Sequence, residues 1–254
     1  MRKGSLLFSD MIITSEHNEA VSEVKKLLDK KYRKLLGKYV IEGERLVADA
    51  IRYGADVQRI FIRAGSEDKF SFADATVVEG RVFDKMTDTV CSQGVLAVVR
   101  IKTPPLSPPQ GNALVLDGLQ DPGNVGTLIR TAAACGFTDV YAVNCADVYS
   151  PKTLRAAMSA HFCVNVYLSE DISAVLKLQS GNLLAADMAG KNVFCVDVRG
   201  RTTLIVGNEG NGLSAESRRA AKLVSLPMRN GFESLNAAVA GSVIMYQINY
   251  KNMQ

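Results

Sequence analysis

The second half of the sequence alternates short β-rich runs with helical segments. Strands are expected at residues 113–117, 140–143, 164–168, 183–186, 203–206 and 223–226, and helices at 125–135, 151–159, 172–178, 215–221 and 235–249. Apolar strands separated by helices are typical of a parallel sheet that is covered on both faces. Ligands bind such sheets where the strands end, at their carboxyl edge. We therefore expect an α/β domain over residues 112–254, with a ligand site at that edge.

A proline-rich stretch precedes this domain. Four of the seven prolines lie within residues 103–111, where they disfavour both a helix and a central strand, so a stiff linker is predicted. Residues 1–102 then form a smaller α/β domain, with strands near 39–41, 58–63, 75–78 and 95–101 and helices at 21–35 and 44–53. Lys and Arg outnumber Asp and Glu by 18 to 15 before Thr103 and by 12 to 11 from there on. Most of the positive surplus therefore lies in the N-terminal part.

The expected helix at 21–35 is amphipathic, because apolar residues recur at steps of three and four. These residues are Val21, Val24, Leu28, Tyr32 and Leu35. Its other face is basic and would suit phosphate contacts made by Lys30, Lys31, Arg33 and Lys34. The alternative is an ordinary solvated helix face.

Several classes of protein are disfavoured by the sequence. The five cysteines have no C-x-x-C spacing and the two histidines lie far apart, so no metal site is expected. The longest apolar stretch, residues 237–246, is half of the ~20 residues that span a bilayer, and no signal-peptide core follows Met1. We expect a soluble cytoplasmic protein that begins at Met1 or Met11.

The first strand–helix loop, residues 117–132, contains a lone cation. A tight turn is expected at Pro122-Gly123, directly before the helix. Arg130 is the only charged residue between Val125 and Phe137. A guanidinium among small apolar residues favours an anion or phosphate as its partner, while an arginine that reaches solvent from a surface face is an equal alternative.

Two further loops follow later strands. Residues 207–212 place three glycines around Glu209, which lets backbone approach a ligand closely, but they match neither G-x-G-x-x-G nor a P-loop. Nicotinamide enzymes, P-loop nucleotidases and Rossmann-type methyltransferases are therefore disfavoured. Residues 226–240 lead into the last helix, with Ser234 as the expected N-cap.

Together the three loops resemble the three motifs of the SpoU (TrmH) family of RNA 2′-O-ribose methyltransferases, within the SPOUT superfamily. Residues 121–126 with Arg130 resemble the first motif, 207–210 the second, and 226–228 with 234–236 the third. Gly231 lies one residue later than the glycine common in this family. Upstream, residues 42–47 and 93–99 resemble the substrate-binding domain of members that act on ribosomal RNA.

The resemblance implies a deep trefoil knot, one of the rare exceptions to unknotted chains, in a domain that binds S-adenosylmethionine. It places the cofactor against Gly207, Gly210, Leu226, Met228, Ser234, Leu235 and Asn236. Arg130 would bind a phosphate and stabilise the forming alkoxide, because guanidinium does not act as a base, and Asn124 and Glu209 would orient Arg130 and the ribose. No metal is required.

The resemblance also implies RNA as the partner, contacted by the basic helix, and a homodimer formed by the last helix. Small residues at positions 237, 238 and 240–242 would allow close packing there, although the same face could instead be buried within one chain. Two other functions remain open, a transfer-RNA methyltransferase and a non-catalytic RNA-binding protein on the same fold. The N-terminal domain favours ribosomal RNA, and the intact motif residues disfavour a non-catalytic role.

Overall fold

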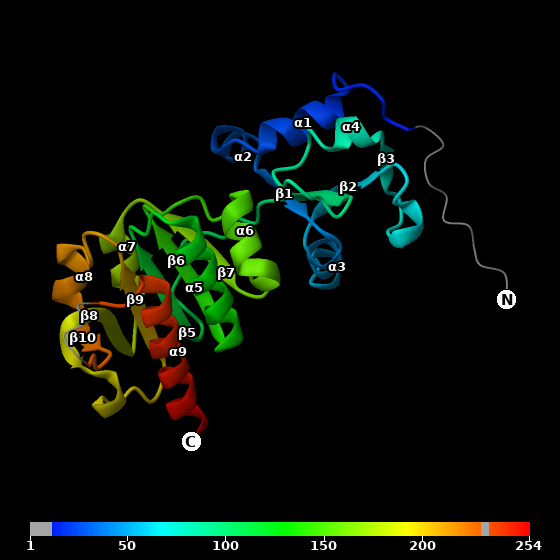
Figure 1. The fold of residues 1–254 in the computed structure, drawn as a ribbon. Coiled ribbons are helices and arrows are strands. Elements are labelled where there is room, and N and C mark those ends of the chain that lie inside the picture. Colours follow the sequence, from blue (N-terminus) through cyan, green and yellow to red (C-terminus); the bar gives the residue numbers. More distant parts are fainter. Residues whose placement is uncertain (1–11, 230–233) are drawn as a thin grey trace. The chain divides into compact units, whose positions relative to one another are not determined.

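The computed structural model of the 254-residue chain describes residues 12–229 and 234–254 (Figure 1). Met1, Met11 and Gly231, which were singled out in the sequence, lie outside these residues. The chain divides into two compact units. One comprises the residues up to Lys102 together with Tyr149–Pro151, and the other comprises Thr103–Val148 and Lys152–Gln254.

The first unit is built on a four-stranded mixed sheet in the order β1-β4-β2-β3. Its strands are β1 (Lys38–Glu42), β2 (Val57–Arg63), β3 (Thr76–Val78) and β4 (Val95–Arg100). Its helices are α1 (Glu19–Leu27), α2 (Lys30–Leu36), α3 (Glu44–Arg52), α4 (Gly80–Phe83) and the 3-10 turn η1 (Glu67–Lys69). Strand β4 pairs antiparallel with β1 and β2, whereas β2 and β3 are parallel.

The prediction of a single helix at 21–35 is wrong, because the helix is interrupted between α1 and α2. The Asp29 carboxylate caps α2 by accepting a hydrogen bond from the Lys31 amide at 2.8 Å. The break changes the helical phase: Leu27 is buried, but Leu35 is 71% exposed. It also turns Arg33 inward, where it is buried and donates to the Leu27 carbonyl at 2.7 Å.

The second unit is built on a six-stranded, wholly parallel sheet in the order β10-β8-β9-β5-β6-β7. Its strands are β5 (Asn112–Asp117), β6 (Phe137–Val143), β7 (Asn165–Ser169), β8 (Asn182–Asn192), β9 (Thr202–Gly207) and β10 (Lys222–Ser225). Its helices are α5 (Pro122–Ala134), α6 (Pro151–Ala157), α7 (Ile172–Leu178), α8 (Ala215–Ala220) and α9 (Ala237–Met253), with the 3-10 turns η2 (Met158–Phe162) and η3 (Val193–Cys195). The parallel α/β domain expected from the sequence is therefore confirmed.

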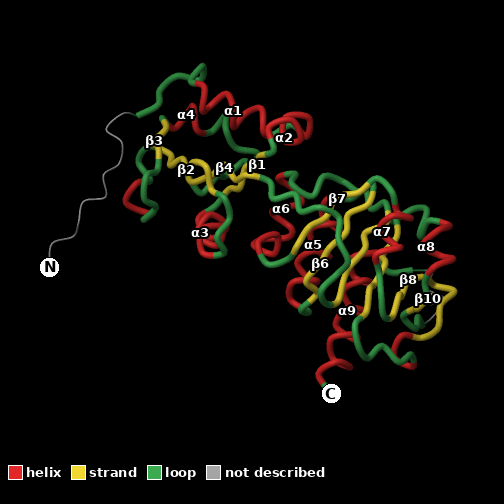
Figure 2. The backbone as a smooth tube through the Cα atoms, turned by 180° about the vertical axis from the view of Figure 1, so that it is seen from behind, coloured by secondary structure: helices red, strands yellow, loops and turns green. Residues whose placement is uncertain are grey.

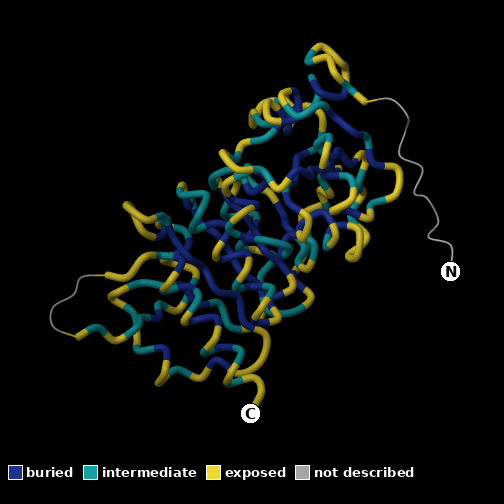
Figure 3. Tube along the Cα trace, turned by 45° about the vertical axis from the view of Figure 1, so that its right-hand side comes forward, coloured by how far each residue is buried: buried dark blue, intermediate teal, exposed yellow. Residues whose placement is uncertain are grey.

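Helices cover both faces of this sheet (Figures 1 and 2). Helices α5 and α9 pack against each other on one face, and α7 and α8 pack together on the other. Alternate strand residues face the two layers, as the two-residue period of a strand requires. Val115 and Ile205 join the cluster that contains Val175 of α7, whereas Val206 lies against α9. Figure 3 shows buried stretches of the chain running through the interior of each unit.

The predicted linker at 103–111 contains neither helix nor strand and is bonded to the second unit. The Tyr141 hydroxyl donates to the Ser107 carbonyl at 2.7 Å, and the Gln110 amide donates to the buried Asp139 carboxylate at 3.1 Å. Within residues 12–229 and 234–254, no helix combines the length and the hydropathy needed to cross a bilayer.

Candidate active site

The sheet register brings the predicted site loops together at the carboxyl edge. Asp117, the last residue of β5, lies opposite Gly207, the last residue of β9, so the loops that follow these strands are neighbours. Strands β8 and β10 flank β9 on its other side. Helix α9 then begins at the same edge and runs back over the sheet, in contact with β9 and α5.

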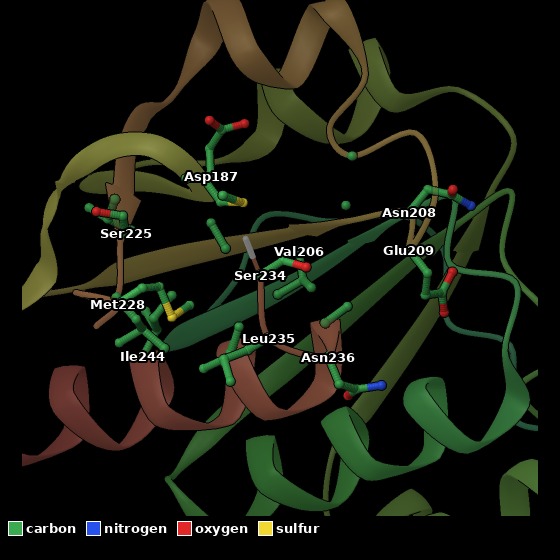
Figure 4. Close-up of a pocket in the computed structure, with 18 of the residues that line it drawn as sticks. Asp187, Val206, Asn208, Glu209, Ser225, Met228, Ser234, Leu235, Asn236 and Ile244 are labelled. Carbon is green, nitrogen blue, oxygen red and sulfur yellow. The ribbon is translucent and has the colours of Figure 1, made fainter. Parts of the chain in front are cut away.

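The loop after β9, part of β8, the end of β10 with the residues after it, and the start of α9 line a pocket of about 890 Å³ (Figure 4), within the range of small-ligand sites. All seven residues predicted to hold the cofactor line it: Gly207, Gly210, Leu226, Met228, Ser234, Leu235 and Asn236. Val206 and Ile244 add apolar wall, and Glu209 and Asn208 lie at one end (Figure 4). The second and third sequence motifs therefore share one pocket, and none of the described residues that line it belongs to the first motif.

The glycine loop after β9 is a tight hairpin. Asn208 and Gly212 exchange two backbone hydrogen bonds of 2.9 Å, which fold the loop back over Gly207. A Cβ at Gly207 would lie 2.5 Å from the Gly212 carbonyl carbon, so only glycine fits. The sequence predicted that a ligand comes close to the backbone at Gly207, whereas in this structure the close neighbour of Gly207 is the protein's own backbone.

A chain of side-chain hydrogen bonds crosses from α9 to the glycine loop. Asn236 Nδ2 donates to Asn124 Oδ1 at 3.0 Å, and Asn124 Nδ2 donates to Glu209 Oε1 at 3.0 Å. The Glu209 carboxylate also accepts the amides of Gln120 and Asp121, at 3.1 and 3.2 Å. One residue from each of the three motifs is thus fixed relative to the other two.

The electrostatics of Glu209 follow from these contacts. Burial alone would raise its pKa, but the hydrogen bonds from Asn124 and from the Gln120 and Asp121 amides outweigh burial and lower it. The pKa of Asp121 is lowered as well, first by the Asn124 amide and then by Lys152, whose ammonium lies 3.0 Å from it. Both carboxylates are therefore negative at neutral pH and poor proton acceptors.

Arg130 does not join this cluster, contrary to the expectation that Asn124 and Glu209 orient it. Its side chain is exposed on α5 and makes no hydrogen bond or ion pair with any residue in the described ranges. Arg130 follows Asn124 by six residues, about 600° of helical rotation, so the two side chains leave the helix in different directions. The acceptors of Glu209 are taken instead by amides and by Asn124.

Two helix starts also differ from expectation. Asn236, not Ser234, caps α9, since its side-chain oxygen accepts from the Ala238 and Val239 amides at 2.9 and 3.1 Å. The turn expected at Pro122-Gly123 is already the first turn of α5, capped by Asp121. Proline at the first helical position has no amide to leave unpaired, which is why it is tolerated there.

Asn208 is an organising residue that sequence reasoning missed. Its side-chain oxygen accepts the Gly210 and Asn211 amides at 2.9 Å each, and its amide group donates to the Gly118 carbonyl at 2.7 Å. An Asn two residues before a Gly is a recognisable signal for such a side-chain turn. Asn208 thereby holds the glycine loop against the loop after β5.

The pocket suits a nucleoside cofactor with a charged tail. Its apolar walls can cover an adenine ring, and polar residues and glycines line it beside them. No group of three or more His, Cys, Asp or Glu side chains that could hold a metal ion occurs within residues 12–229 and 234–254.

Comparisons with known proteins give the class. Residues 111–246 match the model of the SpoU rRNA Methylase family, and residues 18–97 match the MRM3-like substrate binding domain. The chain is 32% identical over 244 residues to the 23S rRNA (guanosine(2553)-2′-O)-methyltransferase RlmP of Bacillus subtilis, covering 93% of this chain and 98% of that protein.

Two solved structures agree. An AdoMet-bound rRNA methyltransferase from Sinorhizobium meliloti superposes with a TM-score of 0.84 at 26% identity, over 94% of this chain and 97% of that one. An RNA 2′-O ribose methyltransferase superposes with a TM-score of 0.81 at 26% identity, over 96% of this chain and 100% of that one.

The fold and the three site loops define an RNA methylase built on a parallel α/β sheet, and the chain belongs to the SpoU rRNA methylase family. It is an RNA 2′-O-ribose methyltransferase with S-adenosylmethionine as cofactor. The family predicted from the loops is thereby confirmed.

Proposed function

We propose that this chain methylates one ribose 2′-hydroxyl in ribosomal RNA and that the pocket of Figure 4 holds the S-adenosylmethionine. The observation that carries the proposal is the bonded chain Asn236–Asn124–Glu209, which joins all three motifs beside a pocket lined by every predicted cofactor residue. When bound, S-adenosylmethionine supplies the methyl group that is transferred to the 2′-oxygen. The residues of the chain must therefore position the ribose and stabilise its developing negative charge.

In this proposal Arg130 contacts the RNA rather than the cofactor. Its exposed guanidinium can bind a backbone phosphate through two parallel N–H donors and stabilise the developing negative charge on the 2′-oxygen as the 2′-hydroxyl gives its proton to a solvent water. Asn124 and Glu209 act as positioning residues for the pocket, because they hold the motif-one and motif-two loops together.

Ribosomal RNA is favoured over transfer RNA by the N-terminal unit. Residues 18–97 match a substrate-binding domain, and the aligned Bacillus subtilis relative, named for 23S rRNA, covers almost the whole chain. In this unit the segments 42–47 and 93–99 meet: the Glu44 amide donates to Gln93 Oε1 at 3.0 Å, and the Gly43 amide donates to the Val95 carbonyl. These contacts support the proposal that the two segments form one RNA-binding surface.

The basic part of that unit is α2. Lys30, Lys31 and Lys34 are exposed and form no ion pair with any described residue, so their charges are available for RNA phosphates. Arg33 was also predicted to bind RNA, but its side chain is buried and donates to the Leu27 carbonyl, so it is not part of the proposed RNA contact.

The homodimer remains part of the proposal, with a changed contact face. Of the small residues expected at the interface, Ala238 and Gly241 are buried in their own chain, and Ser242 Oγ lies 2.9 Å from Thr131 Oγ1 of α5. The outward stripe of α9 is instead apolar and exposed, and comprises Val239, Val243, Tyr246, Tyr250 and Met253. We call these five residues the α9 stripe and infer that a second copy covers them.

The family fold implies a trefoil knot, and a crystal structure that traces residues 230–233 between β10 and α9 would decide it.

A cytoplasmic location is consistent with five cysteines that form no disulfide in this structure.

The test uses ribosomal RNA purified from cells that lack the gene. The purified protein and S-adenosylmethionine should restore one 2′-O-methyl group, detected as a site that resists alkaline cleavage. The same assay with bulk transfer RNA should give none. If only transfer RNA is methylated, transfer RNA and not ribosomal RNA is the substrate. Failure to bind S-adenosylmethionine would overturn the proposal.

A further inference from the structure

A second polar group lies in the pocket, remote from the Asn236–Asn124–Glu209 chain. Asp187 of β8 and Arg218 of α8 form an ion pair, and both line the cavity. Figure 4 shows Asp187 beneath α8, across the pocket from Asn236. Neither residue belongs to the three motifs.

Asp187 is held firmly. Its side chain is only 11% exposed, Oδ1 accepts the Ala189 amide at 2.9 Å, and Oδ2 accepts the Arg218 guanidinium. The Arg218 side chain is 47% exposed. A guanidinium carries five N–H donors, and one carboxylate oxygen leaves most of them unused.

Arg218 is also the only Lys or Arg among the described residues that line the pocket. Residues 230–233, which precede Ser234 in the sequence, contain neither residue type. An oriented guanidinium that opens onto a cavity is suited to bind a carboxylate through two parallel hydrogen bonds.

We propose that Arg218 binds the α-carboxylate of the methionine part of S-adenosylmethionine, and that Asp187 is the residue that positions Arg218. The carboxylate is the one anionic group of this cofactor, and the apolar walls leave it no other described cation inside the pocket. This inference rests on the proposed assignment of the pocket to S-adenosylmethionine.

An RNA phosphate is the competing partner for Arg218. The position of the pair favours the cofactor, because Asp187 lies on the side of the pocket away from Asn236, whereas the proposed RNA contact, Arg130, is on α5. Replacing Arg218 should weaken cofactor binding if its partner is the carboxylate, and RNA binding if its partner is a phosphate.

The experiment compares S-adenosylmethionine with its decarboxylated form, which lacks only the carboxylate, by calorimetry. The unaltered protein should bind S-adenosylmethionine roughly tenfold more tightly than the decarboxylated ligand, as expected for hydrogen bonds between charged groups. Arg218→Met should remove this preference by weakening S-adenosylmethionine alone. Arg219→Met is the matched control, because Arg219 is the next residue of α8, pairs with Glu216 and does not line the pocket; it should bind both ligands as the unaltered protein does.

A doubly substituted variant, Asp187→Asn with Arg218→Met, removes the repulsion that an unmatched Asp187 would exert on the ligand carboxylate. It should still bind S-adenosylmethionine no better than the decarboxylated ligand. Recovery of the preference in the double variant, equal weakening of both ligands by Arg218→Met, or weaker RNA binding with unchanged cofactor binding would each overturn the inference. If the unaltered protein binds neither ligand, the pocket assignment fails as well.

Discussion

Asn124 is the residue through which the three loops are joined. Its amide group donates to Glu209 and its oxygen accepts from Asn236, so a single side chain satisfies partners on the loop after β9 and on α9. Its backbone amide also completes the Asp121 cap of α5. A side chain of other shape could not make both bonds, and we therefore regard Asn124 as fixing the geometry of the pocket rather than reacting.

Arg130 allows a sharper test of mechanism. Arg130→Ala should lower the single-turnover rate of methyl transfer by about 10²–10³ while leaving S-adenosylmethionine affinity unchanged, because one positioned donor to a developing oxyanion is worth that much. Arg130→Lys keeps the charge but loses the planar fork, so it should recover little activity. The matched control is Lys177→Met, at an exposed position of α7. An alanine variant within a few-fold of the parent would remove Arg130 from the reaction.

Gly207 gives a prediction about folding. Gly207→Ala should lower the free energy of unfolding by about 1–3 kcal/mol, the usual cost of overpacking, because its Cβ would meet the backbone of Gly212 and Leu213. Gly210→Ala, in the same loop, should not, since the nearest atom to a Cβ there is Asn208 Oδ1 at 3.6 Å. Urea unfolding followed by circular dichroism compares the two. Equal stability of both variants would contradict the tight hairpin.

At the scale of elements, the spacing of hydrophobic residues and the positions of turn and capping residues predicted the bounds of helices and strands where the two signals did not conflict. Helix α7 was predicted at its observed bounds, 172–178, and β5 to within one residue. Predictions failed where two signals competed: Asp29 interrupts an otherwise continuous helical period because its side chain caps α2. Helix 21–35 therefore could not be separated into two by periodicity alone.

The site shows the same division. The motif residues of the pocket could be predicted because their loops follow β9 and β10, two parallel strands of one sheet whose carboxyl ends lie at the same edge. The direction of Arg130 could not, since it depends on the helical phase of α5 and on Glu209 being occupied by backbone amides. The Asp187–Arg218 pair carried no local signal, because it joins residues 31 positions apart.

The orientation of α9 is likewise a tertiary effect with a testable result. Small residues face inward because Gly241 approaches Leu128 and Val206, where a Cβ would clash at 2.6 and 3.0 Å, and this turns the α9 stripe outward. Tyr246→Glu with Val243→Glu should convert a particle of twice 27.4 kDa into one of 27.4 kDa. Light scattering after gel filtration measures this, with Lys177→Glu on α7 as control. A doubly substituted protein that keeps the parent mass would place the dimer interface elsewhere.

At the scale of the whole molecule, the two units have separate chemical tasks in the proposed function. The second unit carries the cofactor pocket, and the first carries the exposed lysines of α2. Substitutions in α2 should therefore alter RNA affinity without altering cofactor affinity, and substitutions deep in the pocket should do the reverse.

Neutralising Lys30, Lys31 and Lys34 together tests this division. RNA binding should weaken, and the slope of log affinity against log salt should flatten by about 0.7–0.9 for each phosphate that is no longer neutralised, because fewer counterions are released. Cofactor affinity should stay the same. The control removes the same charge from the exposed residues Lys69, Lys177 and Lys222. If both triple variants change the slope equally, net charge and not α2 attracts the RNA.

His161 links the stability of the molecule to pH. It is buried, and its Nε2 lies 2.8 Å from the Val148 carbonyl, which can only accept, so Nε2 carries the proton of a neutral ring. Burial lowers the pKa of His161 to about 4, although the Val148 carbonyl and the Asp147 charge act in the opposite direction. In the unfolded chain the ordinary value is about 6.5.

Between pH 6.5 and about 4 the unfolded chain thus binds a proton at His161 that the folded chain does not bind. The free energy of unfolding should fall through this window as the pH is lowered, by about 3 kcal/mol in total from this group. His161→Gln lacks that proton, and the titrating carboxylates are common to both proteins. Urea unfolding at pH 7 and at pH 4.5 measures the free energy of unfolding of both proteins. Between these two pH values the parent should therefore lose more of it than the variant. Parallel losses in the two proteins would mean that His161 is protonated in the folded state as readily as in the unfolded one.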